Sequence, residues 1–189
     1  MNIFVLDYDQ ERCAQYHCDK HVVKMIVEYA QLLSTAHRIL DGEMKIVEYT
    51  AKTGKPRKKK VYMLPDVREQ ILYKATHANH PSAVWARKSL RNYQWLSSLL
   101  GWLCKEYTHR YGKIHKVQAS GLMDRLYKHP KHFNKPNAPI EMTTIPQAMP
   151  EEFQREDVVE AYRAFYNGSK ARFAKWKLGN APKWFKLEL

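Results

Sequence analysis

One long amphipathic segment, residues 9–40, constrains the fold of this chain more than any other feature of its sequence. At about 100° per residue, its polar and titratable side chains fall within roughly one third of a helix circumference. This stripe comprises Cys13, His17, Lys20, His21, Lys24, Glu28, Gln31, Thr35 and Arg38. The opposite side is apolar and predicts a core-facing surface, with Cys18, Val22, Met25, Ile26, Tyr29, Leu33 and Ala36. The segment therefore predicts one long helix, capped by Asp9 and ended at Asp41-Gly42.

The stripe carries the groups that proton transfer, metal binding and amine nucleophiles require. Lys20 and Lys24 flank His21, and a neighbouring cation favours the neutral, nucleophilic form of an amine. Glu28 can either move protons or pair with Lys24 one turn away. A solvated helix face with hydrogen-bonded histidines is the alternative interpretation. The candidate catalytic residues are His17, Lys20, His21, Lys24 and Glu28, together with His80 at a predicted helix junction.

No metal or cofactor is expected from the sequence. Cys13, His17 and His21 stand at i, i+4 and i+8, and two such turns span about 12 Å, which is too far for one zinc ion with bonds of about 2.1 Å. Phosphate-binding glycine loops, the G-x-S-x-G elbow and the zinc-deaminase pattern are absent from the sequence.

Charge indicates a polyanionic partner. The chain has 32 Lys and Arg against 19 Asp and Glu, a formal net charge of +13, together with 12 Tyr, 6 Phe and 5 Trp. Cations neutralise phosphates and aromatic rings stack on bases, so we expect DNA binding. The candidate DNA-binding residues are Lys55, Arg57, Lys58, Lys59, Lys60, Trp85, Arg87, Arg91, Arg110, Lys113 and Trp184, with Lys52 as a further cation of the same basic tip.

The rest of the chain predicts a mainly α, compact helical single domain spanning residues 1–189. Residues 45–64 form a small basic β-hairpin insertion, with strands at 45–49 and 61–64 around a Gly54/Pro56 turn. Further helices are expected over 66–75, 82–111 and 151–178, with a bend at Gly168, and the apolar segment 1–6 is either a strand or a buried arm.

A cytoplasmic location is expected, in the host cell if the protein is phage-encoded. No apolar run approaches the roughly 20 residues of a membrane helix, so no membrane partner is expected. The three cysteines do not form a disulfide framework.

The order of these features resembles the phage pyrimidine-dimer DNA glycosylases of the endonuclease V type. The likeness rests on a short N-terminal arm, a long helix starting Ala14-Gln15-Tyr16-His17, a histidine-bearing break at 77–80, a helix rich in Arg and aromatics, and Trp184-Phe185. The chain also resembles phage proteins without assigned chemistry, through the segments HCDKHVVKMI, NHPSAVWAR, EYTHRYGKIH and IPQAMP. The glycosylase resemblance implies an all-α fold that flips a base and cleaves its glycosidic bond.

Two departures from that family stand out. The family attacks with the amine of a small residue exposed by methionine removal, whereas Asn2 is too large for that processing, so the amine would be that of Met1. The family's catalytic glutamate lies early on the first long helix, where this chain has His21 to Lys24, and neither Asp19 nor Glu28 is in register with it.

The sequence thus predicts a phage-type DNA-binding enzyme that acts on a pyrimidine base, with glycosylase/lyase chemistry and base flipping. Met1, Lys20 and Lys24 are the candidate amines. One alternative is a base-hypermodification enzyme that transfers an amine or amino acid to an activated thymine. The other is a protein that binds DNA without catalysis.

Overall fold

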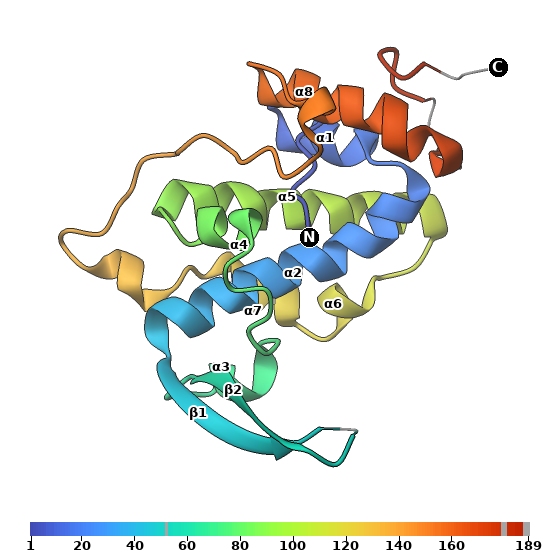
Figure 1. Ribbon diagram of the computed structural model, residues 1–189. Helices are drawn as coiled ribbons and strands as arrows, with labels where there is room; N and C mark the ends of the chain where they lie inside the picture. Colours follow the sequence, from blue (N-terminus) through green and yellow to red (C-terminus); the bar gives the residue numbers. More distant parts are fainter. Residues whose placement is uncertain (52, 179–180, 187–189) are drawn as a thin grey trace.

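The computed structural model describes residues 1–51, 53–178 and 181–186, and its mainly α architecture with one antiparallel hairpin confirms the predicted fold class (Figure 1). The helices are α1 (Gln10–Tyr16), α2 (Asp19–Asp41), α3 (Arg68–Ile71), α4 (Pro81–Ala86), α5 (Leu90–Tyr111), α6 (Lys116–Ala119), α7 (Leu122–Tyr127) and α8 (Val158–Phe165). Short 3-10 or π turns are η1 (Lys131–Asn134), η2 (Glu151–Phe153), η3 (Tyr166–Lys170) and η4 (Ala171–Phe173), and the strands are β1 (Glu43–Thr50) and β2 (Pro56–Met63). In these described ranges no helix is long and apolar enough to cross a membrane.

The core lies where α2 packs along α5, with α1 and α4 against them (Figure 1). The N-terminal segment is the buried arm of the two expected alternatives, because Ile3, Val5 and Leu6 are all buried and unpaired with any strand. The Phe4 amide donates to the Tyr29 hydroxyl at 3.0 Å. These contacts fix the start of the chain on the surface of α2.

The predicted first long helix is wrong in one respect: it is two helices. The chain breaks at His17 and Cys18, whose ψ angles of 130° and 160° are extended. Arg110 bridges the break, since its guanidinium donates to the Gln15 carbonyl at 2.8 Å and to the Asp19 carboxylate at 2.9 Å. Neither glycine nor proline marks this position, so the tertiary contact decides it. The predicted Asp9 cap and the stop at Asp41-Gly42 are confirmed.

Three further helix predictions need correction. The segment 66–75 contains only the single turn α3, and the segment 82–111 is divided into α4 and α5. Ser89 caps α5, because its hydroxyl accepts the Asn92 amide at 3.2 Å. The segment 151–178 is divided among η2, α8, η3 and η4. A π turn replaces the expected bend, and Gly168 is required there because a Cβ would lie 2.5 Å from the Phe153 ring.

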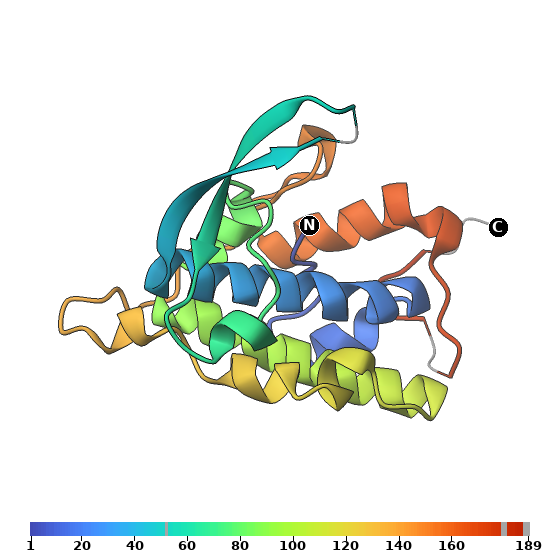
Figure 2. The same cartoon turned by 90° about the horizontal axis from the view of Figure 1, so that it is seen from below.

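The hairpin insertion is confirmed, with both strands longer than predicted. Its register pairs Glu43 with Met63 at the base and Thr50 with Pro56 near the tip. Figure 2 shows the two strands rising from the helical body on the side on which the N-terminus lies, while in Figure 1 they lie below α2, apart from that terminus. Its position relative to that terminus is relevant to function below.

Candidate active site

An open pocket of about 300 Å³ forms where the N-terminal arm, α2 and the η3–η4 turns meet. The arm contributes Met1, Asn2 and Phe4, α2 contributes Lys20, His21, Lys24, Met25 and Glu28, and the C-terminal turns contribute Lys170 and Phe173. A larger hollow of about 460 Å³ lies between α1 and α5. The smaller pocket is the candidate site because it gathers most of the predicted catalytic residues around a carboxylate that contacts two amines.

Glu28 lies between those two amines. One of its carboxylate oxygens is 3.9 Å from the α-amine of Met1, and the other is 3.2 Å from Nζ of Lys24. The Glu28 side chain is only 15% exposed, whereas that of Lys24 is 63% exposed. A half-buried carboxylate interacts more strongly with an adjacent amine than a solvated one does, because less water screens the pair. It can therefore accept a proton from the amine or stabilise a positive charge formed there.

His21 forms one wall of the pocket and is uncharged at neutral pH. Its ring stacks on Phe4 with centroids 4.4 Å apart, and its Nδ1 is 2.5 Å from the Tyr166 hydroxyl. Burial lowers the pKa of His21 to about 3, and the neighbouring His17 and the charges of Lys170, Lys24 and Lys20 act in the same direction. A neutral imidazole in this position can donate or accept a hydrogen bond without adding to the charge of the site.

His80 and Lys170 complete the surroundings. The Nδ1 of His80 accepts the Ser82 amide at 3.2 Å and caps α4. Burial lowers the pKa of His80, the N-terminal amine and His77 lower it further, and Glu28 raises it. His80 is therefore close enough to the Met1 amine and the Glu28 carboxylate to interact with them electrostatically. Burial, with Arg172 and Lys24 nearby, also lowers the pKa of Lys170.

His17 lies apart from the pocket. It is fully buried, with Nδ1 2.7 Å from the Cys13 carbonyl and Nε2 3.3 Å from the Tyr29 hydroxyl. Burial lowers its pKa to about 4. The break between α1 and α2 rotates Cys13 and His17 into the core, so the predicted line of Cys13, His17 and His21 on one face is corrected. In the part of the chain that the structure describes, no group of three His, Cys, Asp or Glu is placed to hold a metal ion.

Sequence reasoning missed the C-terminal part of the site. Lys170 and Phe173 follow α2 by more than a hundred residues, and the aromatic residues around them recur at the three- and four-residue spacing typical of a core-facing helix. Tyr162, Phe165 and Tyr166 are indeed buried. Of the described C-terminal residues, only Lys170, at the end of η3, and Phe173, in η4, line the pocket, and no local sequence pattern marks these positions.

Two of the predicted DNA-binding residues are buried and need correction. Arg110, 3% exposed, donates to Glu106, Asp19 and the Gln15 carbonyl. Trp85, also 3% exposed, donates its indole N–H to the Thr143 carbonyl at 3.0 Å. Their hydrogen-bonding groups are used inside the fold, so neither is available to a phosphate or base.

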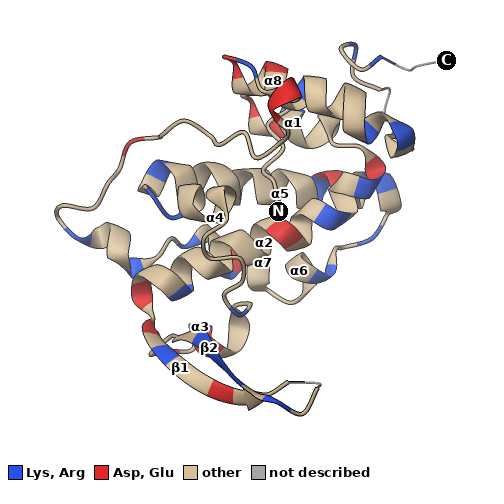
Figure 3. Cartoon of the chain, viewed as in Figure 1, with Lys and Arg blue, Asp and Glu red and all other residues tan. Residues whose placement is uncertain are grey.

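The other predicted DNA-binding residues differ in accessibility. Arg87 is half-buried and donates to the Ala78 carbonyl, and Trp184 is half-buried with the Arg163 guanidinium 5.3 Å from its ring. The exposed ones are Arg91, Lys113, Lys55, Arg57, Lys58, Lys59 and Lys60. Lys52 lies outside the described residues. Figure 3 shows the basic residues concentrated along β2 and along the half of α2 that begins at Asp19.

The buried histidines predict a steep loss of stability in acid. Burial lowers the pKa values of His17, His21 and His37 to about 4, 3 and 4, below the 6.5 of an unfolded histidine. Between pH 6.5 and about 4 the unfolded chain therefore binds protons that the folded chain does not, and stability is lost as the pH falls. At pH 5 we expect unfolding to take up about three protons, a slope of about 4 kcal/mol per pH unit.

Urea unfolding at pH 7, 6 and 5 measures this slope. An exposed histidine provides the control, because His109→Ala should leave the pH dependence unchanged. An unfolding free energy that stays constant from pH 7 to pH 5 would contradict the expected burial of neutral imidazoles.

Comparison with known proteins gives one family. A family model described as pyrimidine dimer DNA glycosylase matches residues 1–119. No curated protein and no solved structure matches the chain. The matched region contains Met1, Lys24 and Glu28, whereas Lys170 and Phe173 lie beyond it.

Proposed function

Because the chain belongs to the pyrimidine dimer DNA glycosylase family, we propose that it excises a pyrimidine base from DNA with the α-amine of Met1 as the nucleophile and Glu28 as the assisting carboxylate. The observation that carries this proposal is the 3.9 Å separation between that amine and the Glu28 carboxylate. Although Glu28 is out of register with the family's glutamate along the sequence, the folded arm brings the amine to it. This proximity supports the role proposed for Glu28 despite the departure in sequence.

The proposed reaction proceeds through a covalent intermediate. The neutral amine attacks C1′ of the deoxyribose, the glycosidic C–N bond breaks, and the base leaves as an anion that takes a proton from water. Glu28 accepts the proton that the attacking amine loses and passes it to the ring oxygen as the sugar opens. The carboxylate is then an anion again and stabilises the cationic Schiff base. Met1 is favoured over Lys24 because the Lys24 amine is largely solvated, whereas the Met1 side chain is only 7% exposed.

Base flipping follows from the same proposal. A protein amine reaches C1′ of a stacked nucleotide only when the nucleotide is drawn out of the duplex. We expect Lys20, Lys24 and Lys170 at the rim of the pocket to hold the phosphates beside the extruded nucleotide. His21 stays neutral, so it can form hydrogen bonds along the pocket wall but does not attract the phosphates by charge.

Borohydride trapping tests the nucleophile. Incubation with dimer-containing or abasic duplex should give a reduced, permanent protein–DNA adduct, and peptide mass mapping should place it on Met1. Lys24→Arg is the matched control: arginine keeps the positive charge beside Glu28 but provides no amine for a Schiff base. This variant should still form the adduct.

Other outcomes would count against the proposal. An adduct mapped to Lys20 or Lys24, and lost in the corresponding arginine variant, would move the nucleophile to α2. If neither substrate gives an adduct, the glycosylase proposal fails. Nucleoside mass spectrometry on modified DNA then distinguishes base hypermodification from DNA binding without catalysis.

A further inference from the structure

The hairpin, residues 43–63, is an arm whose side chains are largely uncovered by the body. Ile46 is 62% exposed, Met44 47% and Tyr49 40%. An isolated two-stranded sheet is marginally stable in water, and apolar side chains that remain uncovered indicate a binding surface. The arm therefore has the form of an element completed by a partner.

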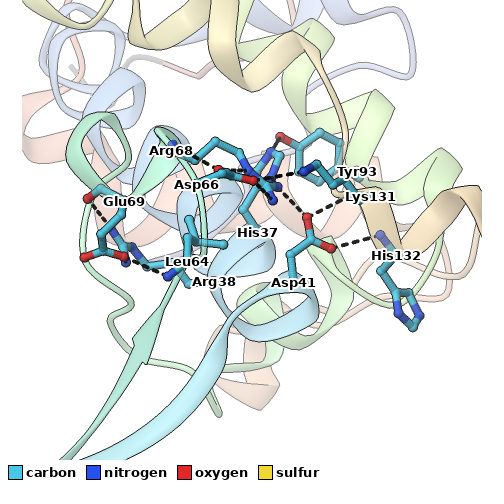
Figure 4. A network of polar contacts seen from close by, with 10 residues as sticks. All are labelled: His37, Arg38, Asp41, Leu64, Asp66, Arg68, Glu69, Tyr93, Lys131 and His132. Atoms are coloured by element: carbon cyan, nitrogen blue, oxygen red, sulfur yellow. Dashed lines mark hydrogen bonds and ion pairs between the residues drawn. The ribbon is translucent and has the colours of Figure 1, made fainter.

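The base of the arm is fixed by buried charge (Figure 4). Arg38 is fully buried and uses its guanidinium to bind the carbonyls of Tyr62, Tyr73, Leu72 and Glu69 and the Glu69 carboxylate. That carboxylate also accepts the Leu64 amide at 2.8 Å, just beyond the end of β2. The direction of the arm is thus set by α2 and does not depend on its exposed tip.

A second part of the same network, around Arg68 and Asp41, also holds the base of the arm. Arg68 donates to Asp66 and Asp41, and Asp41 in turn accepts the backbone amides of Lys131 and His132 (Figure 4). These contacts tie α2, the segment after β2 and η1 together. The base of the arm is therefore held to the helical body by hydrogen bonds to two separate segments.

The charge of the arm identifies its partner as a polyanion. Its described residues include six cations, Lys45, Lys55, Arg57, Lys58, Lys59 and Lys60, and only two acids, Glu43 and Glu48. Lys58 pairs with Glu48 at 3.2 Å and Lys45 with Glu43 at 3.2 Å. Among the described residues, the remaining four cations have no carboxylate partner.

The register sorts these cations onto two faces. Lys58 and Lys60 lie opposite Glu48 and Ile46, on the same face as Tyr62 and Met44. We call this the inner face of the arm. Tyr62 influences the pKa of the Arg87 guanidinium, so at the base of the arm the inner face lies beside the end of α4. Arg57 and Lys59 lie opposite Tyr49 and Val47, on the outer face.

We propose that the arm holds duplex DNA on its inner face and so positions the duplex over the pocket that contains the Met1 amine. Lys60 would bind a phosphate, and Lys58 would exchange its exposed Glu48 partner for a second phosphate. This inference rests on the proposed function. The arm rises on the side of the body on which the N-terminus lies (Figure 2), and the DNA major groove admits a two-stranded ribbon. Ile46, directly opposite Lys60 on the inner face, is an exposed apolar side chain that a bound duplex would cover.

Fluorescence anisotropy with a duplex carrying a non-cleavable abasic analogue tests the arm. Lys58→Ala/Lys60→Ala should weaken binding at 0.15 M salt by about 30-fold, since each lost duplex phosphate contact removes a factor of about 5.5, and the log–log salt slope should fall by about 2 × 0.9. The outer-face variant Arg57→Ala/Lys59→Ala removes the same charge from the same strand. Although the sequence groups these two cations with the DNA-binding candidates, on the outer face they should only add to the positive field of the arm, so the affinity should fall by less than about threefold. Circular dichroism melts confirm that both variants remain folded.

Equal losses in the two variants, a larger loss in the outer-face variant, or no loss in either would overturn the proposal. The outcome is separable from that of the proposed function. If inner-face substitution weakens duplex binding while the wild-type protein gives no borohydride adduct, the result supports the role of the arm and contradicts the proposed amine chemistry. If the adduct forms and the two double variants bind alike, the result supports the amine chemistry and contradicts the role of the arm.

Discussion

Replacing Glu28 with glutamine should lower the single-turnover rate of base excision by about 10²- to 10⁴-fold, the effect typical of one positioned acid–base group. Glutamine keeps the size of the side chain but cannot accept the proton of the Met1 amine or balance the charge of a Schiff base. The affinity for DNA should be retained or increase, because a negative charge is lost from a basic surface. Rapid-quench kinetics on dimer-containing duplex, with anisotropy on the same duplex, measures both quantities.

The matched control for this substitution is Glu152→Gln. Glu152 is exposed on η2, outside the pocket, so the same loss of charge there should leave the excision rate within about twofold. A Glu28→Gln rate within threefold of the wild-type rate would mean that the carboxylate only anchors the N-terminus.

The Arg38→Met variant should lose about 3–5 kcal/mol of unfolding free energy, the usual cost of breaking a buried ion pair. Methionine retains much of the apolar stem but leaves the Tyr62, Leu72 and Tyr73 carbonyls without their donor. For a chain of this size, the expected fall in melting temperature is on the order of 10 °C. Chemical denaturation followed by circular dichroism provides the free energy.

Lys74→Ala is the control for that measurement. Lys74 contacts the same Glu69 carboxylate, but its side chain is 74% exposed. Exposed pairs contribute at most about 1 kcal/mol, so this substitution should be nearly neutral. If both variants lost the same small amount, the root of the arm would be held by apolar packing and not by the Arg38 contacts.

The sequence alone determined the class of the fold and the positions of several boundaries. Apolar spacing of 3.6 residues fixes which face of α2 is buried, and Val22, Met25, Ile26 and Tyr29 all lie in the core as predicted. Local chemistry fixes the Asp9 cap, the Asp41-Gly42 stop and the hairpin around Gly54, whose φ of 77° suits glycine. These features depend on neighbours within a few residues and can therefore be read from the sequence.

Only the tertiary structure decided which polar residues of the first segment are accessible. Cys13, His17, Thr35 and Arg38 share the polar stripe with Lys24, yet all four are buried. The helix break at His17 turns the first two inward, while segments distant in sequence cover Thr35 and Arg38. Helical periodicity gives the angle of a side chain about its own axis, but not what packs against that side.

The candidate site likewise depends on distant contacts. Glu28 lies beside the Met1 amine because the N-terminal segment runs back along α2. Lys170 reaches the same pocket from a segment far along the chain. The position of a residue along a helix does not show which distant segment will pack beside it. Bringing distant segments together costs chain entropy and is stabilised by packing of the whole core, which no local sequence pattern encodes.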